Sequence, residues 1–140
     1  MRAYYTGEGA QPNCAHEGDA GFDLAYHGQH PIDIAPDETA NIPTGIKVQL
    51  PYGTWAMVTG RSSTFKRGLI TPLSVIDNGY RGDLFAIVRN LSDKIVTIQP
   101  NERVAQLIII PLLADVVTWE KMPYLDDSER GENGFGSTGL

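Results

Sequence analysis

The sequence has little cysteine and no long uninterrupted apolar run. Cys14 is the only cysteine among 140 residues, which excludes an intrachain disulfide and a cysteine-based zinc site and favours a reducing, cytoplasmic compartment. The first fourteen residues, MRAYYTGEGAQPNC, lack the apolar core of a secretory signal. The most apolar stretch, 104–117, is interrupted by Gln106, Pro111 and Asp115. It is too short to span a bilayer, so no membrane partner is expected.

The chain has fewer basic than acidic residues, which bears on whether it binds a nucleic acid. Eleven Lys and Arg stand against seventeen Asp and Glu, which gives a formal net charge of −6. A nucleic-acid polymer is not an expected partner, because binding one needs clustered Lys and Arg. A small anion held by a few local donors is compatible with this charge. An acidic protein that handles a nucleotide is then expected to use a divalent cation to bridge the like charges.

Internal repeats and heptads are absent, and helix content is expected to be low. Apolar residues come in short runs bounded by Gly, Pro, Asn and Asp, a pattern typical of an all-β sandwich or barrel. Strands are predicted at 45–50, 55–59, 84–90, 94–100 and 103–110. The one predicted helix has Ser62 or Ser63 as its N-cap and Gly68 at its end.

The pattern of buried strands ends near Met122. Residues 123–140 contain many turn residues and little to bury, so we expect a β-domain at 1–122 and a mobile, glycine-rich arm at 123–140. Fully extended, the arm could span roughly 60 Å, enough to cross onto a neighbouring subunit. Its end, RGENGFGSTGL, combines anion donors with a single aromatic ring, which disorder alone does not require.

The stretch TGRSSTFKRGL, residues 59–69, has the residue types of an anion site. Arg61 offers a bidentate guanidinium, Ser62 and Ser63 offer hydroxyls, and a helix start offers free N–H groups. The GxxxxGK[ST] loop is absent. A plain capped helix with solvent-facing charges explains the same residues, so this stretch alone leaves both interpretations open.

A second stretch, VIDNGYRGDL at 75–84, predicts a hairpin. Asp-Asn-Gly after a β-branched run is a turn signal, so Asp77 and Asn78 could serve the turn alone. Asp77 also lies at the end of an apolar strand, where a carboxylate can be held rigidly as a general base. Tyr80 adds a flat aromatic face at the same turn.

Two polar residues lie inside predicted strands. Asp23, between Phe22 and Leu24, either faces solvent on an alternating strand or marks a site. Gln106 interrupts an apolar run, and a buried amide must be hydrogen-bonded to the fold or to a ligand. Residues 14–19 include one Cys, one His, one Glu and one Asp, but at no recognised metal-ligand spacing.

Together these segments resemble the five motifs of the trimeric dUTP pyrophosphatase (deoxyuridine triphosphatase, dUTPase) family. The motifs are AGFDL, GRSS, VIDNGYRGDL, RVAQL and RGENGFGSTG, at 20–24, 60–63, 75–84, 103–107 and 130–139. They occur in the family's order and span nearly the whole chain. The resemblance implies a jelly-roll-like β-barrel, a homotrimer with intersubunit active sites, and hydrolysis of dUTP to dUMP and pyrophosphate with Mg²⁺. That reaction keeps uracil out of DNA and supplies dUMP for dTMP synthesis.

The resemblance also implies roles for single residues. Asp77 would be the general base that orients the attacking water, and Tyr80 would leave no room for a 2′-hydroxyl. Asp23 would act through the hydration shell of the magnesium ion. Asn78 and the rest of its hairpin would present backbone groups to uracil. Phosphate oxygens would be held by Arg61, Ser62 and Gln106, and Ser63 is expected to contact the substrate beside them.

By the same resemblance, the arm would complete the site. Phe135 would stack over uracil and Arg130 would reach the γ-phosphate. Gly136 would let the main chain approach the phosphates, and Ser137 and Thr138 would add donors. The arm would open for product release and close to exclude bulk water.

Three positions depart from the family pattern. Ser63 stands where these enzymes often have glycine, as do Asn101 and Asn133, although Asn tolerates left-handed backbone angles. A Ser-Ser pair after Gly-Arg is more typical of related dCTP deaminases, so a deaminase or bifunctional enzyme is one alternative. That branch has a catalytic glutamate after the aromatic residue, whereas this chain has Arg81 after Tyr80. A nucleotide-sensing or protein-binding regulator on the same scaffold is the other.

Overall fold

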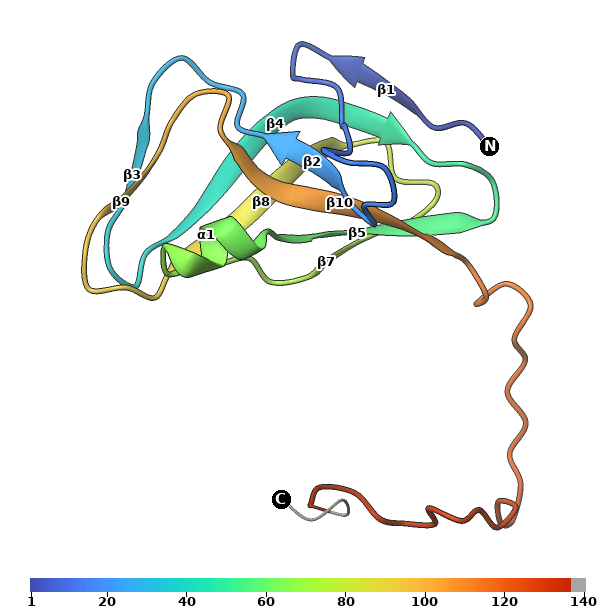
Figure 1. Ribbon diagram of the computed structural model, residues 1–140. Coiled ribbons are helices and arrows are strands. Elements are labelled where there is room, and N and C mark those ends of the chain that lie inside the picture. The colour runs from blue at the N-terminus through green and yellow to red at the C-terminus, as the bar shows by residue number, and fades with distance from the viewer. Residues whose placement is uncertain (137–140) are drawn as a thin grey trace.

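Two four-stranded antiparallel sheets and a two-stranded sheet form the body of the protein (Figure 1). The structure is a computed structural model and describes residues 1–136. The first sheet has the order β1–β4–β8–β6, with bounds Tyr4–Gly7, Thr39–Gln49, Asp83–Asn90 and Leu69–Ile70. The second has the order β2–β10–β5–β7, with bounds Phe22–Ala25, Arg103–Pro111, Thr54–Gly60 and Ser74–Ile76. The separate pair is β3 (Ile32–Ile34) and β9 (Val96–Ile98), and helix α1 is Ser62–Lys66.

The core lies between the two larger sheets. Ile42, Ile46 and Val48 alternate along β4 and are each at most 6% exposed, as expected for a strand with one buried face. Leu24 of β2 and Leu107 of β10 belong to the same core from the opposite sheet. This arrangement confirms the expected all-β, jelly-roll-like fold, and within the described residues the sheets remain two open layers.

β4 is longer than the strand predicted at 45–50. Pro43 and Gly45 look like strand breakers, but they lie where the β4–β8 register shifts between Pro43 and Lys47. Gly45 has a φ of 69° there. An irregularity of this kind accommodates both residues inside one bent strand. The strands predicted at 55–59, 84–90 and 103–110 are confirmed as β5, β8 and β10, whereas β9 covers only part of 94–100.

The helix is capped differently from the prediction. Arg61 is the N-cap, with φ −103° and ψ 151°, and neither Ser62 nor Ser63 has that role. The Thr64 hydroxyl ties the first turn, because it accepts from the Arg61 N–H at 3.2 Å and donates to the Arg61 carbonyl at 2.7 Å. Gly68 follows the helix as predicted, with a φ of 84°. Among residues 1–136 there is no helix with the length and apolar character needed to cross a membrane.

The segment 75–84 is not a hairpin, contrary to the prediction. β7 pairs with β5 in one sheet, and β8 pairs with β4 in the other. A tight turn is present, since the Tyr80 N–H donates to the Asp77 carbonyl at 3.0 Å, but the chain then crosses between sheets. Turn signals are local, whereas a strand's partner depends on the apolar face that must be buried. We call residues 77–82 the crossover.

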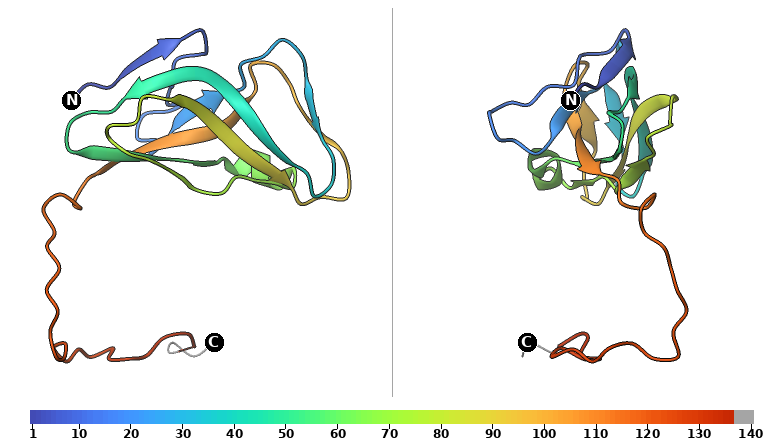
Figure 2. Two further views of the ribbon diagram at one scale, coloured as in Figure 1. Left: turned by 180° about the vertical axis from the view of Figure 1, so that it is seen from behind. Right: turned by 90° about the vertical axis from the view of Figure 1, so that its right-hand side faces the viewer.

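The chain leaves the body after β10. Pro111 is the last strand residue, and every described residue from Leu113 onward is exposed. Both views in Figure 2 show this segment running away from the sheets. It carries large apolar side chains all the same, and Trp119 is 96% exposed. The domain boundary at 122 and the mobility of the arm remain predictions.

Candidate active site

Three strands of the second sheet bring a row of polar residues together. Gln106 of β10 lies opposite Asp23 of β2 on one side and opposite Thr59 of β5 on the other. Directly opposed residues of antiparallel strands project from the same face of the sheet. Arg61 and Ser62 follow at the end of β5, where α1 begins. Residues of three sequence motifs therefore meet at one end of this sheet.

Asp23 is held between two arginines. Its Oδ1 is 2.8 Å from the Nε of Arg61, and its Oδ2 is 3.0 Å from the Nη1 of Arg103. Arg61 also donates from Nη1 to the Arg103 carbonyl at 3.1 Å. The Asp23 side chain is only 14% exposed, so the solvent-facing alternative for this residue is excluded.

Arg103 was not identified as a site residue from the sequence. It is the first residue of the apolar strand β10, and no motif around it indicates a functional role. The β10–β2 register shifts between Arg103 and Ala105, and such irregularities re-aim side chains. Only the pairing of β10 with β2, which no local pattern reveals, brings its guanidinium to Asp23.

Gln106 is oriented by two glycines. Its Nε2 donates to the Gly60 carbonyl at 2.8 Å. Gly21 leaves room for the amide, since a Cβ at position 21 would lie 2.2 Å from the Gln106 Oε1. The fold uses one of the two N–H donors of this amide, which leaves the other for a ligand.

These residues line an open cavity of about 330 Å³. One wall is formed by Asp23, Arg61, Ser62, Ser63 and Gln106, and residues of the loop 15–21 form the other. Guanidinium, hydroxyl and amide donors on one wall are the groups that bind phosphate oxygens. The arrangement can therefore hold a short polyphosphate, and we call it the phosphate cavity.

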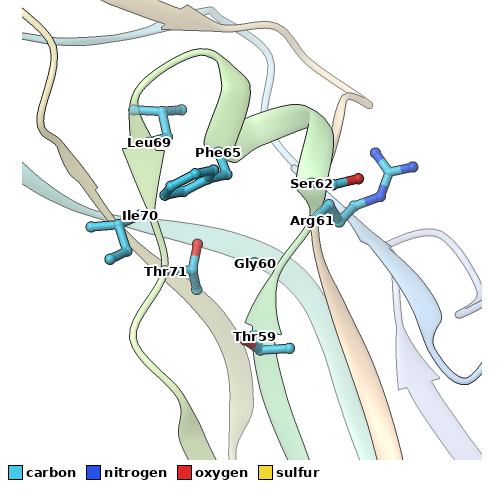
Figure 3. A pocket seen from close by; sticks show the side chains of 8 residues that line it. All are labelled: Thr59, Gly60, Arg61, Ser62, Phe65, Leu69, Ile70 and Thr71. Carbon is cyan, nitrogen blue, oxygen red and sulfur yellow. The ribbon is translucent and has the colours of Figure 1, made fainter. Parts of the chain in front are cut away.

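The loop that carries Arg61 separates the phosphate cavity from a second hollow. This hollow, of about 270 Å³, lies between β5, α1 and β6. Figure 3 shows Phe65 and Thr71 around it, whereas the guanidinium of Arg61 points away. The Thr71 Oγ1 is buried without a hydrogen-bond partner among the described residues. The lining of the second hollow mixes apolar side chains with hydroxyl groups, and the guanidinium of Arg61, its one charged lining residue, points out of it.

Asp77 lies far from the phosphate cavity of its own chain. β7 runs antiparallel to β5 with Ile76 opposite Ala56, so Asp77 lies beside the start of β5, whereas Arg61 follows its end. Six residues of strand span roughly 20 Å. Figure 1 shows α1 on the side of the β3–β9 pair, and the yellow-green crossover on the other side of the body, where β5 begins. The exposed Asp77 carboxylate therefore cannot reach this cavity.

The crossover is pinned by its own side chains. The Nδ2 of Asn78 donates to the carbonyls of Pro51 and Thr54, both at 2.8 Å. The Nη1 of Arg81 donates to the carbonyls of Asn78 and Tyr80, both at 2.9 Å. Both N–H donors of the Asn78 amide are thus used within the fold, and this residue shapes the turn.

The predicted residues of the arm do not join the phosphate cavity of this chain. Arg130 donates from Nε to the Asn133 carbonyl at 3.0 Å, Phe135 is fully exposed, and Gly136 has a φ of 78°. Figure 2 shows the arm apart from both sheets. The remaining two predicted residues, Ser137 and Thr138, lie outside the described residues.

The acidic and histidine residues near the cavity form no metal cage. Within residues 1–136 there is no group of three or more His, Cys, Asp or Glu placed to hold a metal ion. The Nδ1 of His16 lies 3.5 Å from the Oδ2 of Asp19, and the Cys14 thiol donates weakly to the Gly21 carbonyl at 3.4 Å. These contacts stay within the loop that lines the cavity.

The fold and the phosphate cavity define a small all-β protein able to hold a polyphosphate chain. A dUTPase family model matches residues 8–139. Deoxyuridine 5′-triphosphate nucleotidohydrolases of Orientia tsutsugamushi (strain Boryong) and Clostridium novyi (strain NT) are 41% and 42% identical, over 100% and 92% of this chain and 97% and 90% of theirs. The solved Staphylococcus bacteriophage 80alpha dUTPase with dUPNHPP is 26% identical over 99% of both chains, with a TM-score of 0.88. The chain belongs to the dUTPase family.

Replacing Gly21 by alanine tests how Gln106 is oriented. The new Cβ would displace the amide from Gly60, so affinity for pyrophosphate should fall about tenfold, the value of roughly one hydrogen bond. Isothermal titration with pyrophosphate and Mg²⁺ measures this. Gly79→Ala is the matched control, because a Cβ there meets no described atom within 4 Å. Equal affinities for the two variants would contradict the role given to Gly21.

Proposed function

We propose that the protein is a dUTP diphosphatase that hydrolyses dUTP to dUMP and pyrophosphate. Its family, its relatives named deoxyuridine 5′-triphosphate nucleotidohydrolase and its likeness to a phage dUTPase solved with dUPNHPP support this reaction. The observation that carries the proposal is the phosphate cavity, which collects donors on one wall. The reaction limits uracil in DNA and supplies dUMP for dTMP synthesis. We place it in the cytoplasm, where the free Cys14 thiol stays reduced.

The phosphate chain binds to donors that the fold leaves unused. Arg61 contacts Asp23 through its Nε and donates from its Nη1 to the Arg103 carbonyl. Its Nη2 is therefore available for a phosphate oxygen. Gln106 contributes its second amide N–H, and the exposed Ser62 contributes its hydroxyl. The last predicted member of the set is Ser63, whose Oγ also lies 3.4 Å from the Arg61 Nη1.

The family uses a divalent cation, and we assign it as Mg²⁺. Both carboxylate oxygens of Asp23 already accept from arginines, so this residue suits a water of the hydration shell better than the metal itself. Mg²⁺ commonly keeps several waters and binds substrate phosphates with only one or two carboxylates. The residues present fit that arrangement. The cation, when bound, neutralises charge on the triphosphate.

Asp77 acts as the general base. Its carboxylate is exposed and has no hydrogen-bond or ion-pair partner among the described residues, so it is free to take a proton from water. That water attacks the α-phosphorus as the bond from this phosphorus to the bridging oxygen breaks, and pyrophosphate leaves. A positioned base of this kind contributes roughly 10²–10⁴-fold to the rate.

The crossover also reads the nucleoside. Tyr80 lies against the deoxyribose, where a 2′-hydroxyl would collide with its ring. The backbone that Asn78 shapes faces the uracil edge, at which cytosine exchanges donor for acceptor. A buried mismatch there leaves groups unpaired and costs several kcal/mol, enough for rejection on the order of 10⁴-fold.

Each complete site needs a second chain. A base must come within hydrogen-bond reach of its water, whereas Asp77 and Arg61 of one chain are roughly 20 Å apart along β5. We therefore propose a homotrimer in which the phosphate cavity of one subunit meets the crossover of the next. A closed ring uses both ends of every subunit in this way.

The arm supplies the third part of the site. We assign Phe135 to stacking on uracil, Arg130 to the γ-phosphate, and Gly136, Ser137 and Thr138 to donors beside it. The described part of the arm runs away from its own sheets and leaves Phe135 uncovered, which favours closure over a site of another subunit. Closure excludes water other than the nucleophile.

A product assay tests the reaction. With Mg²⁺, the protein should convert dUTP to dUMP and leave dCTP, dTTP and UTP unchanged when nucleotides are resolved by chromatography. Excess EDTA should abolish turnover and added Mg²⁺ should restore it. Formation of dUTP or dUMP from dCTP would instead assign a deaminase, and no turnover of any nucleotide would favour a sensing protein.

Mixing two inactive variants tests the intersubunit site. Asp77→Asn and Arg61→Ala should each reduce kcat by at least about a hundredfold. After joint refolding at equal amounts, one site in four would pair an intact base with an intact cavity, so about one quarter of wild-type activity should return. A matched mixture of two Asp77→Asn preparations is the control. No recovery in the mixed sample would place both residues in one chain's site.

Deleting residues 130–140 tests the arm. Several phosphate donors and the stacking ring are lost together, so kcat/KM for dUTP should fall by at least about a hundredfold. Sedimentation should show the same oligomer as the full chain, because all strands of the described residues lie before position 130. An unchanged kcat/KM would remove the arm from the mechanism.

A further inference from the structure

In the proposed function, Tyr80 must distinguish deoxyribose from ribose although its side chain lies at the surface. Its side chain is 43% exposed, and it lies on the crossover rather than in the core. A ribose differs from a deoxyribose by one oxygen atom, so the ring discriminates only if it is held to within about 0.5 Å. Something outside the core must therefore fix its position.

Two contacts hold the Tyr80 ring. Its Oη donates to the Asp83 carbonyl at 3.0 Å. The ring also folds back over Gly82, where an added Cβ would lie 2.3 Å from Oη, 2.5 Å from Cζ and 3.0 Å from Cε2. The ring thus occupies the volume that any side chain at position 82 would take. The backbone beneath it is clamped by Arg81.

We propose that Gly82 is a specificity-determining residue for the sugar, acting as a positioning residue through Tyr80. The inference rests on the proposed dUTP hydrolysis. An alanine at position 82 forces the ring off the Asp83 carbonyl, because the atoms in its way are the free end of a side chain. Gly82 is not among the positive-φ glycines, so the backbone accepts alanine. The change therefore moves the ring and leaves the fold intact.

The test compares kcat/KM for dUTP and UTP in wild type, Gly82→Ala and Gly79→Ala. In Gly82→Ala the ratio of dUTP to UTP should fall at least tenfold, about 1.4 kcal/mol of discrimination, with UTP hydrolysis rising. Gly79→Ala alters the same crossover, but its Cβ meets no described atom within 4 Å and its φ is also not positive. Gly79→Ala can change kcat/KM for both nucleotides, because this backbone faces uracil in the proposed site. Since dUTP and UTP carry the same base, however, its ratio should stay within about twofold of wild type.

A second variant separates the two contacts. Tyr80→Phe keeps the ring over Gly82 but loses the bond to the Asp83 carbonyl, so its ratio should fall less than that of Gly82→Ala. Titration calorimetry with dUMP and UMP gives the same comparison without turnover, in case Gly82→Ala hydrolyses neither nucleotide. Equal ratios for Gly82→Ala and Gly79→Ala in both measurements would overturn the role of Gly82. A wild-type protein without preference for dUTP would instead overturn the proposed function.

Discussion

The register of β10 against its two neighbours places the whole phosphate cavity. Gln106 lies between Ala105 and Leu107, whose exposed fractions are at most 3%. A register slip of one residue along β10 would therefore turn the Gln106 side chain into the core. Burying one leucine contributes about 1.5–3 kcal/mol, whereas the bond from Gln106 to Gly60 contributes about 1 kcal/mol. The core therefore sets the register, and the site follows from it.

The phosphate cavity and the crossover, which the proposed function combines into one site, are each held in place by hydrogen bonds without any ligand. In the phosphate cavity, Asp23 is held by its ion pairs with Arg61 and Arg103. In the crossover, the side chains of Asn78 and Arg81 donate hydrogen bonds to backbone carbonyls. Preorganised donors cost no rearrangement when charge develops in the transition state. The length of β5 separates Asp77 from the phosphate cavity of the same chain. In the proposed homotrimer, assembly would bring together two surfaces that are already formed in the single chain, and the arm would then close over them.

Local patterns in the sequence predicted much of this protein, and long-range pairing accounts for what they missed. Three interior strands, the position of Gly68 just after α1 and the left-handed angle of Asn101, with a φ of 65°, follow from alternation and turn chemistry. β1, β3 and β6 have two to four residues, too short for a periodic signal. The wrongly predicted hairpin at 75–84 and the contact of Arg103 with Asp23 depend on which strands pair, and no single segment encodes that pairing. The contact between Tyr80 and Gly82 is local, but no residue pattern indicates where the ring folds.

The exposed apolar segment after β10 gives the chain a built-in optical probe. The sequence has two tryptophans: Trp55 is half-buried within β5, and Trp119 is 96% exposed. Indole emission shifts to shorter wavelength when the ring leaves water. A shift would therefore report, in real time and without a label, any contact that covers Trp119.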